Sequence, residues 1–171
     1  MVTTGRVDPP RQADERSMLE AWLDWQRATL AMKCEGLGDE QLRRRAVPPS
    51  TLSLLGLVRH MAEVERGWFR RTLAGEEAPA LYYSEANPDG DFDDVDPADP
   101  EEAFDAWRRE CGRAAELMAG VGSLDQEPAR RGRDGAVISV RWIMVHMIEE
   151  YARHNGHADL LRQCIDGATG E

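Results

Sequence analysis

The sequence contains little that would direct it out of the cytoplasm. Its apolar runs fall short of the roughly 18 residues that a membrane-spanning helix needs, and residues 1–16 lack the apolar core of a signal peptide. The three cysteines, Cys34, Cys111 and Cys164, are widely separated and form no CxxC pair, which argues against a disulfide framework or a zinc–thiolate site. We therefore expect a cytoplasmic protein with free, mostly buried thiols and no membrane partner.

Positive charge is also scarce. The chain carries 21 Lys and Arg against 32 Asp and Glu, a formal net charge of −11 at pH 7. Much of the excess is local, since residues 85–105 contain ten acidic residues and no Lys or Arg. Binding nucleic acid through its phosphates needs a basic face. The composition therefore argues against nucleic acid as a partner.

The acidic segment has only a superficial likeness to a calcium loop. Counting from Asp89, position six is Asp94 where such a loop has glycine, and position twelve is Pro100 where it has glutamate. We reject an EF-hand here and expect a solvated connection, with the rim of a functional cavity as the alternative.

Apolar residues recur at three- and four-residue spacing in four segments, which predicts four amphipathic helices. We place these helices at residues 17–38, 51–75, 101–120 and 140–167. The acidic, proline-containing connection between the second and third helices is long enough to carry the chain the length of a bundle. The pattern predicts an all-α four-helix bundle with a long crossover, formed by one domain at residues 17–171 after a flexible arm at residues 1–16.

Five tryptophans occur at helical spacing, and large aromatic residues at such positions usually fill the core or an interface, or line a pocket. They are Trp22, Trp25, Trp68, Trp107 and Trp142. Ser50 or Thr51 can cap the second helix and Ser139 the fourth. The loop before the fourth helix can form a small hairpin around Asp134 and Gly135.

Histidine is used sparingly, and three of the four histidines fall within "HMIEEYARHNGHADLLRQ", which begins at His146. His146, Glu150 and His154 are separated by four residues each, and His157 follows three residues later. On a helix all four side chains share one face. Residues four apart can hold one ion together, as in HExxH with a carboxylate in place of the first imidazole.

The remaining histidine, His60, lies near the apolar stripe of the second helix. Two ligands alone bind a metal weakly, so we predict a divalent-metal site made of His60, Glu150 and His154. Two imidazoles and a carboxylate leave coordination positions open, which suits catalytic Zn²⁺ and equally Ni²⁺ or Fe²⁺.

His146 and His157 flank these residues, and we expect them to support the ligands or line a cavity, with Glu63 or Glu149 as partners. The same ladder has a plainer interpretation. A histidine in a helix is commonly a partly buried, hydrogen-bonded residue, and alternating His and Glu can form a solvated face stabilised by i,i+4 pairs. Spacing alone does not show that the second helix faces the fourth.

The segments "LVRHMAEVERGWF" at 57–69 and "HMIEEYARHNGHADLLR" at 146–162 together resemble the DinB superfamily, in particular its actinobacterial branch of unknown function. The resemblance covers about Met18 to Gly167. It implies a four-helix bundle with a long crossover, in which one histidine of the second helix and two residues four apart in the fourth hold a divalent metal. Those two are commonly both histidines, but related mycothiol-dependent maleylpyruvate isomerases have a glutamate first.

On this chain the matching positions are His60, Glu150 and His154. Many relatives have "HHRGQ" where this chain has "RHNGH", so Arg153 replaces a histidine and His157 replaces a glutamine. Whether His157 is a supporting residue or a fourth ligand stays open.

Characterised relatives use a low-molecular-weight thiol, such as mycothiol or bacillithiol, for S-transfer, isomerisation or detoxification. The resemblance implies a metal-dependent thiol S-transferase or isomerase acting on an electrophilic small molecule, with Arg153 or Arg66 contacting an anionic group. Two alternatives stay open: a stress-related bundle whose metal is not catalytic, and a metal-dependent hydrolase. Members of the superfamily commonly pair through helix faces, so a homodimer is a further option.

Overall fold

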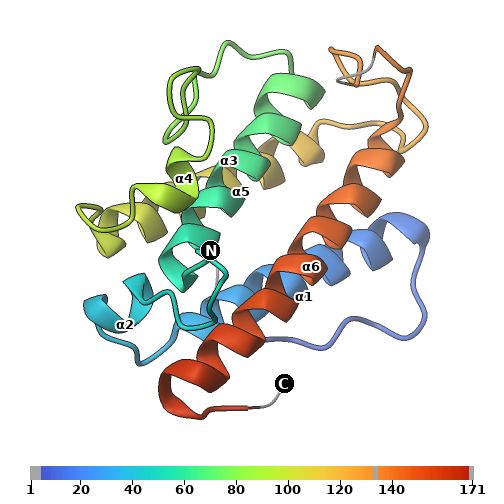
Figure 1. The fold of residues 1–171 in the computed structure, drawn as a ribbon. Helices are drawn as coiled ribbons and strands as arrows, with labels where there is room; N and C mark the ends of the chain where they lie inside the picture. Colours follow the sequence, from blue (N-terminus) through green and yellow to red (C-terminus); the bar gives the residue numbers. More distant parts are fainter. Residues whose placement is uncertain (1–4, 133–134, 170–171) are drawn as a thin grey trace.

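The computed structural model describes residues 5–132 and 135–169, and four long helical segments account for most of them (Figure 1). The segments are α1 (Glu15–Cys34), α3 (Leu54–Glu65) continued by the π-helix η1 (Arg66–Leu73), α5 (Pro100–Ala119) and α6 (Val140–Asp166). Two short helices, α2 (Asp39–Arg43) and α4 (Gly90–Asp93), lie in the connections. Within the described ranges there is no strand, and the predicted all-α four-helix bundle is confirmed.

Contacts between side chains give the direction of each helix. Glu65 contacts Cys111, and Glu76 just after η1 contacts Arg113, so α3 and α5 run parallel. The crossover at residues 74–99, which contains α4, carries the chain back along α3 to make this possible. By contrast, His60 lies beside His154 and Trp68 beside Trp142, so α3 and η1 run antiparallel to α6.

Helix starts follow from side-chain caps. Asp14 accepts from the N–H of Ser17, so α1 begins at Glu15, two residues earlier than expected. The cap of α3 is Ser53, which accepts from the N–H of Gly56, and the predicted caps at residues 50 and 51 are wrong. Ser139 caps α6 as predicted, by accepting from the N–H of Trp142. The hairpin expected around residues 134–135 falls partly outside the described residues.

The second predicted helix changes its hydrogen bonding part-way. From Arg66 onward its turns are π-helical, and the N–H of Ala74 bonds to the carbonyl of Phe69. Arg66 and Arg70 both reach the carboxylate of Glu110 on α5 from this wider turn. Apolar periodicity alone did not predict this change from α-helical to π-helical turns. Phe69 continues the apolar stripe whichever of the two hydrogen-bonding patterns the helix has.

The core is formed by apolar residues of all four long helices, and Trp107 is the only tryptophan that is fully buried. Trp22 and Trp142 are 41% and 45% exposed, so they do not fill the core, and an interface or a pocket stays the prediction for them. Trp25 and Trp68 are partly buried. Of the three thiols, Cys34 and Cys111 are buried and Cys164 is exposed.

A buried polar network joins the four long helices. Glu65 is fully buried, and both its oxygens accept from Arg27 at 2.7 Å. The same carboxylate accepts from the hydroxyl of Tyr151 at 2.8 Å, and that hydroxyl accepts from the indole N–H of Trp107 at 2.8 Å. Cys111 completes the group, with its sulfur 3.6 Å from Oε1 of Glu65. We call these five residues the closed cluster.

Side chains of α3 and η1 hold the crossover against the bundle. The guanidinium of Arg59 donates to the carbonyls of Gly90 and Asp91. The carboxylate of Glu63 accepts from the N–H groups of Leu81 and Tyr82. The crossover is therefore packed on one side by specific hydrogen bonds, although most of its acidic side chains are exposed.

Candidate metal centre

His60 lies midway along α3, and α4 of the crossover fixes its ring from two directions. Its Nδ1 is 2.8 Å from the carboxylate of Asp91, which is only 5% exposed. The ring also stacks on Phe92, with centroids 4.6 Å apart and planes 25° apart. An ionised carboxylate only accepts hydrogen bonds, so a neutral His60 ring in this contact would carry its proton on Nδ1 and leave the lone pair of Nε2 for an ion. The imidazole is thereby oriented as a ligand.

Glu150 and His154 of α6 meet this imidazole. The rings of His60 and His154 lie 4.7 Å apart, and Nε2 of His154 is 3.5 Å from Oε2 of Glu150. One ligand atom from each of the three residues falls within 4.8 Å of the others, so they could hold a metal ion together. The structure therefore brings together the three residues that were predicted as ligands, from two helices that are far apart in the sequence.

The charge state of Glu150 suits that arrangement. Its contact with His154 lowers the pKa of the carboxyl below its usual value. Partial burial works in the opposite direction, and the nearby His146 and His60 add further favourable charge. Glu150 is therefore a carboxylate at neutral pH, as a ligand to a divalent cation must be.

His157 lies on the other side of His154, where the Nδ1 atoms of the two rings are 3.4 Å apart. Burial lowers the pKa of His157, and the charges of His154 and Arg153 lower it further, so the neutral form of this ring is favoured. Both roles considered for His157, a supporting residue and a fourth ligand, stay predictions.

His146 stands one turn before Glu150, and its two ring nitrogens are each 3.5 Å from a carboxylate, Glu149 on one side and Glu150 on the other. These three residues form a second group whose ligand atoms converge. Arg153 is mostly exposed and pairs with Glu149 at 3.2 Å. Glu149 is thus a partner of His146, as expected, whereas Glu63 binds the crossover backbone instead.

Arg66 is not near an open site. It donates to the carbonyl of Pro79 and to Glu110, and only 11% of its side chain is exposed. Its expected contact with an anionic group would require these buried bonds to break. Arg66 instead fastens the start of the crossover to α5.

Sequence reasoning missed Asp91 and Phe92, because their segment was interpreted as a solvated acidic run. The one feature of this segment that could have indicated a packed turn is Gly90, two residues before Phe92. A Cβ at Gly90 would lie 2.4 Å from the carbonyl oxygen of Tyr82, so only glycine permits this close approach of backbone to backbone. The packed turn directs Asp91 toward His60.

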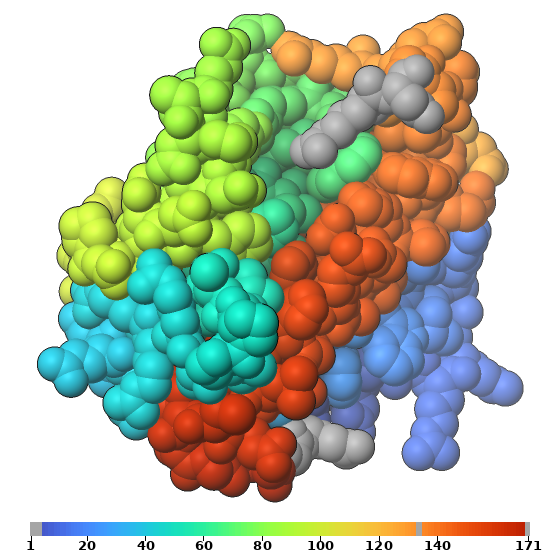
Figure 2. All heavy atoms as spheres, in the orientation of Figure 1, coloured from blue at the N-terminus to red at the C-terminus, as the bar shows by residue number. Residues whose placement is uncertain are grey.

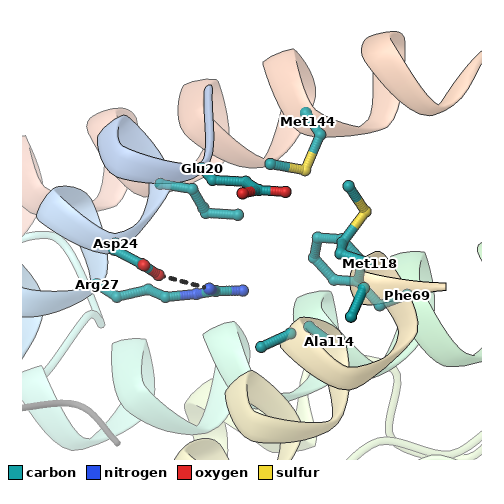
Figure 3. Close-up of a pocket in the computed structure, with 10 residues that line it drawn as sticks. Glu20, Asp24, Arg27, Phe69, Ala114, Met118 and Met144 are labelled. Carbon is teal, nitrogen blue, oxygen red and sulfur yellow. Dashed lines mark hydrogen bonds and ion pairs between the residues drawn. The ribbon is translucent and has the colours of Figure 1, made fainter. Parts of the chain in front are cut away.

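The space-filling view shows a hollow between the crossover and α6, with α3 and η1 behind it (Figure 2). A separate pocket of about 190 Å³ lies between α1, η1, α5 and α6 (Figure 3). Its wall is mainly apolar and includes Phe69, Met118 and Met144. The carboxylate of Asp24 at this pocket is paired with Arg27 at 3.0 Å. None of the four histidines lines it, so the pocket is distinct from the metal centre.

The family described as mycothiol-S-transferase matches residues 18–167. The chain belongs to this family. The match confirms the resemblance seen in the two helical motifs, over the range that those motifs indicated. No curated protein matches the chain significantly.

Membership in the mycothiol-S-transferase family agrees with a thiol-transferase-like function acting on small molecules. As to membranes, none of the helices in the described parts of the chain combines the length and the apolar character that crossing a bilayer requires.

Proposed function

We propose that the protein is a metal-dependent S-transferase that joins a low-molecular-weight thiol, such as mycothiol, to an electrophilic small molecule. One observation carries the proposal. His60, Glu150 and His154 converge from two helices, and their ligand atoms fall within 4.8 Å of one another. The family match supports a low-molecular-weight thiol as the cosubstrate.

The donor set fits a divalent cation with open coordination positions, Zn²⁺ in the first place and Ni²⁺ or Fe²⁺ as alternatives. Such a cation, when bound, would lower the pKa of a thiol that coordinates it, so that a thiolate exists at neutral pH. Asp91 and His157 hold the two imidazoles from behind. The positions of the ligands are therefore set before anything binds, which reduces the cost of ordering them.

The cysteines of the chain do not supply the nucleophile. Cys34 and Cys111 are buried, and burial raises the pKa of both thiols. Cys164 is exposed but follows His154 by ten residues on α6, about 15 Å along the helix axis. The attacking sulfur must therefore come from a separate thiol molecule, in agreement with the family name.

In the proposed reaction the thiolate sulfur forms a bond to the electrophilic carbon, and the leaving group departs with its bonding electron pair. The proton of the thiol passes to solvent. With an activated double bond the sulfur adds to one carbon, and the electron pair of the double bond moves to the other carbon. That carbon then takes a proton from solvent to give the adduct, or the thiolate leaves after bond rotation to give the isomer. Free cysteines and a thiol cosubstrate are what a reducing cytoplasm would maintain, so we place the protein there.

The experiment compares His60→Ala, Glu150→Ala and His154→Ala with Glu149→Ala, which removes the neighbouring carboxylate on the same helix. Metal affinity is measured by competition with a chelator, helicity by circular dichroism, and turnover with mycothiol and an electrophile. We expect each ligand variant to lose at least about tenfold in affinity, with helicity intact, while Glu149→Ala changes little.

Three other results would contradict the proposal. Equal metal loss in Glu149→Ala would move the ion to the group around His146. A metal that resists chelation until the protein unfolds, with no turnover, would indicate a structural role. Activity without any thiol would indicate a hydrolase.

A further inference from the structure

An aromatic group stands next to the metal centre and is not part of the core. Trp68 of η1 and Trp142 of α6 lie 5.3 Å apart between ring centroids, with their planes 55° apart. His146 contacts both rings, stacked on Trp142 at 4.9 Å and edge-on to Trp68 at 4.7 Å. We call these three residues the aromatic wedge.

One member of the wedge, Trp142, is exposed where a bundle would ordinarily bury an aromatic residue. Trp107 is fully buried, but Trp142 is 45% exposed and the adjacent Val145 is 52% exposed. Leaving so much apolar surface in water costs free energy, and exposed apolar groups that lie together commonly mark a binding site. The core does not use this surface.

The position of the wedge relates it to the reaction. Nε2 of His146 is 3.5 Å from Oε1 of Glu150, so the wedge directly adjoins a predicted ligand. Along α6, Trp142 precedes Glu150 by eight residues, about 12 Å of helix. A ring that rests on the exposed part of Trp142 would therefore lie on the part of α6 that leads to the centre, with His146 between the ring and Glu150.

We propose that the aromatic wedge is a subsite for the flat, conjugated part of the electrophile. This inference rests on the proposed function, because it assigns the bound ring to the second substrate. His146 is stacked on one face of Trp142, so a flat ring would use the exposed remainder of this indole in a stacked or edge-to-face contact, which aromatic pairs prefer. The centre would thus favour aromatic electrophiles over small aliphatic ones.

The chemistry of the rim favours a flat apolar ring over the sugar ring of a thiol. A sugar needs hydrogen bonds to its hydroxyl groups when it leaves water. The charged groups beside the wedge are occupied with one another, since Glu149 contacts both His146 and Arg153. The exposed neighbour on the same helix is Val145, which offers no hydrogen bond.

The test measures binding of 2,4-dinitroaniline, a flat ring that cannot react with a thiol, to the full-length protein by calorimetry. We expect Trp142→Ala and Trp68→Ala to weaken binding by up to about tenfold, and Trp142→Phe to restore most of it. Trp22→Ala is the matched control, because Trp22 is similarly exposed but pairs with Trp25 on α1. It should leave the affinity unchanged.

A kinetic comparison gives a second measurement. With mycothiol as the thiol, Trp142→Ala should raise the KM for 1-chloro-2,4-dinitrobenzene and leave that for iodoacetamide unchanged. If Trp68→Ala fails to fold, the Trp142 variants alone decide the matter, since their side chain is largely outside the core.

Failure of the two proposals can be told apart. Binding of the unreactive ring needs neither turnover nor thiol, so a protein that binds it at Trp142 without transferring sulfur would contradict only the proposed function. Absence of binding to the wild-type protein, or equal affinity in Trp142→Ala, would overturn the subsite. So would a loss of mycothiol binding in Trp142→Ala with dinitroaniline binding unchanged, because the wedge would then hold the thiol.

Discussion

Two polar clusters lie side by side in the bundle, and consecutive residues of α6 belong to them. Tyr151 belongs to the closed cluster, where the carboxylate of Glu65 is fully buried and its oxygens accept hydrogen bonds at 2.7 to 2.8 Å. Glu150 belongs to the metal centre, where its oxygens stand 3.5 Å from two imidazoles. The first carboxylate has short, well-formed bonds, whereas the contacts of the second are long.

The difference separates a structural polar cluster from one that can bind a ligand. In the closed cluster, donors and acceptors satisfy each other, and burial makes that pairing necessary. In the candidate metal centre, Nδ1 of His60 contacts Asp91 and Nδ1 of His154 contacts His157. One ligand atom from each of His60, Glu150 and His154 lies within 4.8 Å of the others. Lone pairs that converge in this way are suited to a cation.

The largest expected effect tests whether the two buried thiols, Cys34 in the core and Cys111 in the closed cluster, are shielded from solvent. Burial raises the pKa of Cys34 to about 12, and it raises that of Cys111 as well. Against a free thiol of pKa about 8.5, the thiolate fraction of Cys34 at neutral pH falls more than about a thousandfold. A disulfide reagent should therefore titrate one thiol per native chain, Cys164, and three after unfolding.

Cys164→Ser is the control, and it should abolish the fast phase. Rapid labelling of Cys111 in the native protein would show that the closed cluster opens.

The raised pKa of Cys34 also makes the stability of the folded protein depend on pH. The folded-state pKa of Cys34 is raised, so its contribution to stability is complete below about pH 8.5 and is lost as the pH rises toward about 12.

The next effect concerns the stability of the closed cluster. Glu65→Ala leaves the guanidinium of Arg27 buried without its main partner, which should cost about 3–5 kcal/mol in the free energy of unfolding. Urea unfolding measures this. Asp24→Ala removes the other, exposed partner of the same guanidinium, and it should cost less than about 1 kcal/mol.

Metal affinity of the folded Glu65→Ala protein should stay close to that of the wild type, because the two clusters have separate roles. An equal cost for the Asp24 and Glu65 variants would contradict the distinction between buried and exposed pairing. The combined change Arg27→Met with Glu65→Leu should recover much of the lost stability.

A smaller effect is expected where the crossover supports the metal centre. Asp91→Ala removes the acceptor that holds Nδ1 of His60, and metal affinity should fall about 10- to 100-fold without loss of helix. Competition with a chelator measures the change. Asp93→Ala, an exposed acid of the same short helix, is the matched control. If both variants bind metal like the wild type, Asp91 does not orient the ligand.

The smallest effect is expected at Arg153. Its side chain is 61% exposed, and its guanidinium pairs with Glu149 rather than with the predicted ligands. Arg153→Ala should change metal affinity by less than about twofold, because exposed ion pairs contribute little. A loss comparable to that of the Asp91 variant would place Arg153 inside the candidate metal centre.

The sequence predicted what depends on local periodicity. Residues four apart on a helix face the same way, so His146, Glu150 and His154 could be placed on one face of α6 before any fold was known. The apolar stripes and the long connection likewise predicted the four long helices and the crossover. These properties follow from the geometry of a single helix and from chain length.

Tertiary packing decided the rest. Whether His60 faces α6 depends on how two helices pack, and no spacing within either helix determines that. Asp91 reaches His60 because the crossover folds back and Gly90 permits a close backbone contact. Trp142 stays exposed because the core is filled by other side chains. Contacts between distant segments arise from the shape of the packed chain, so they could not be obtained from any one segment alone.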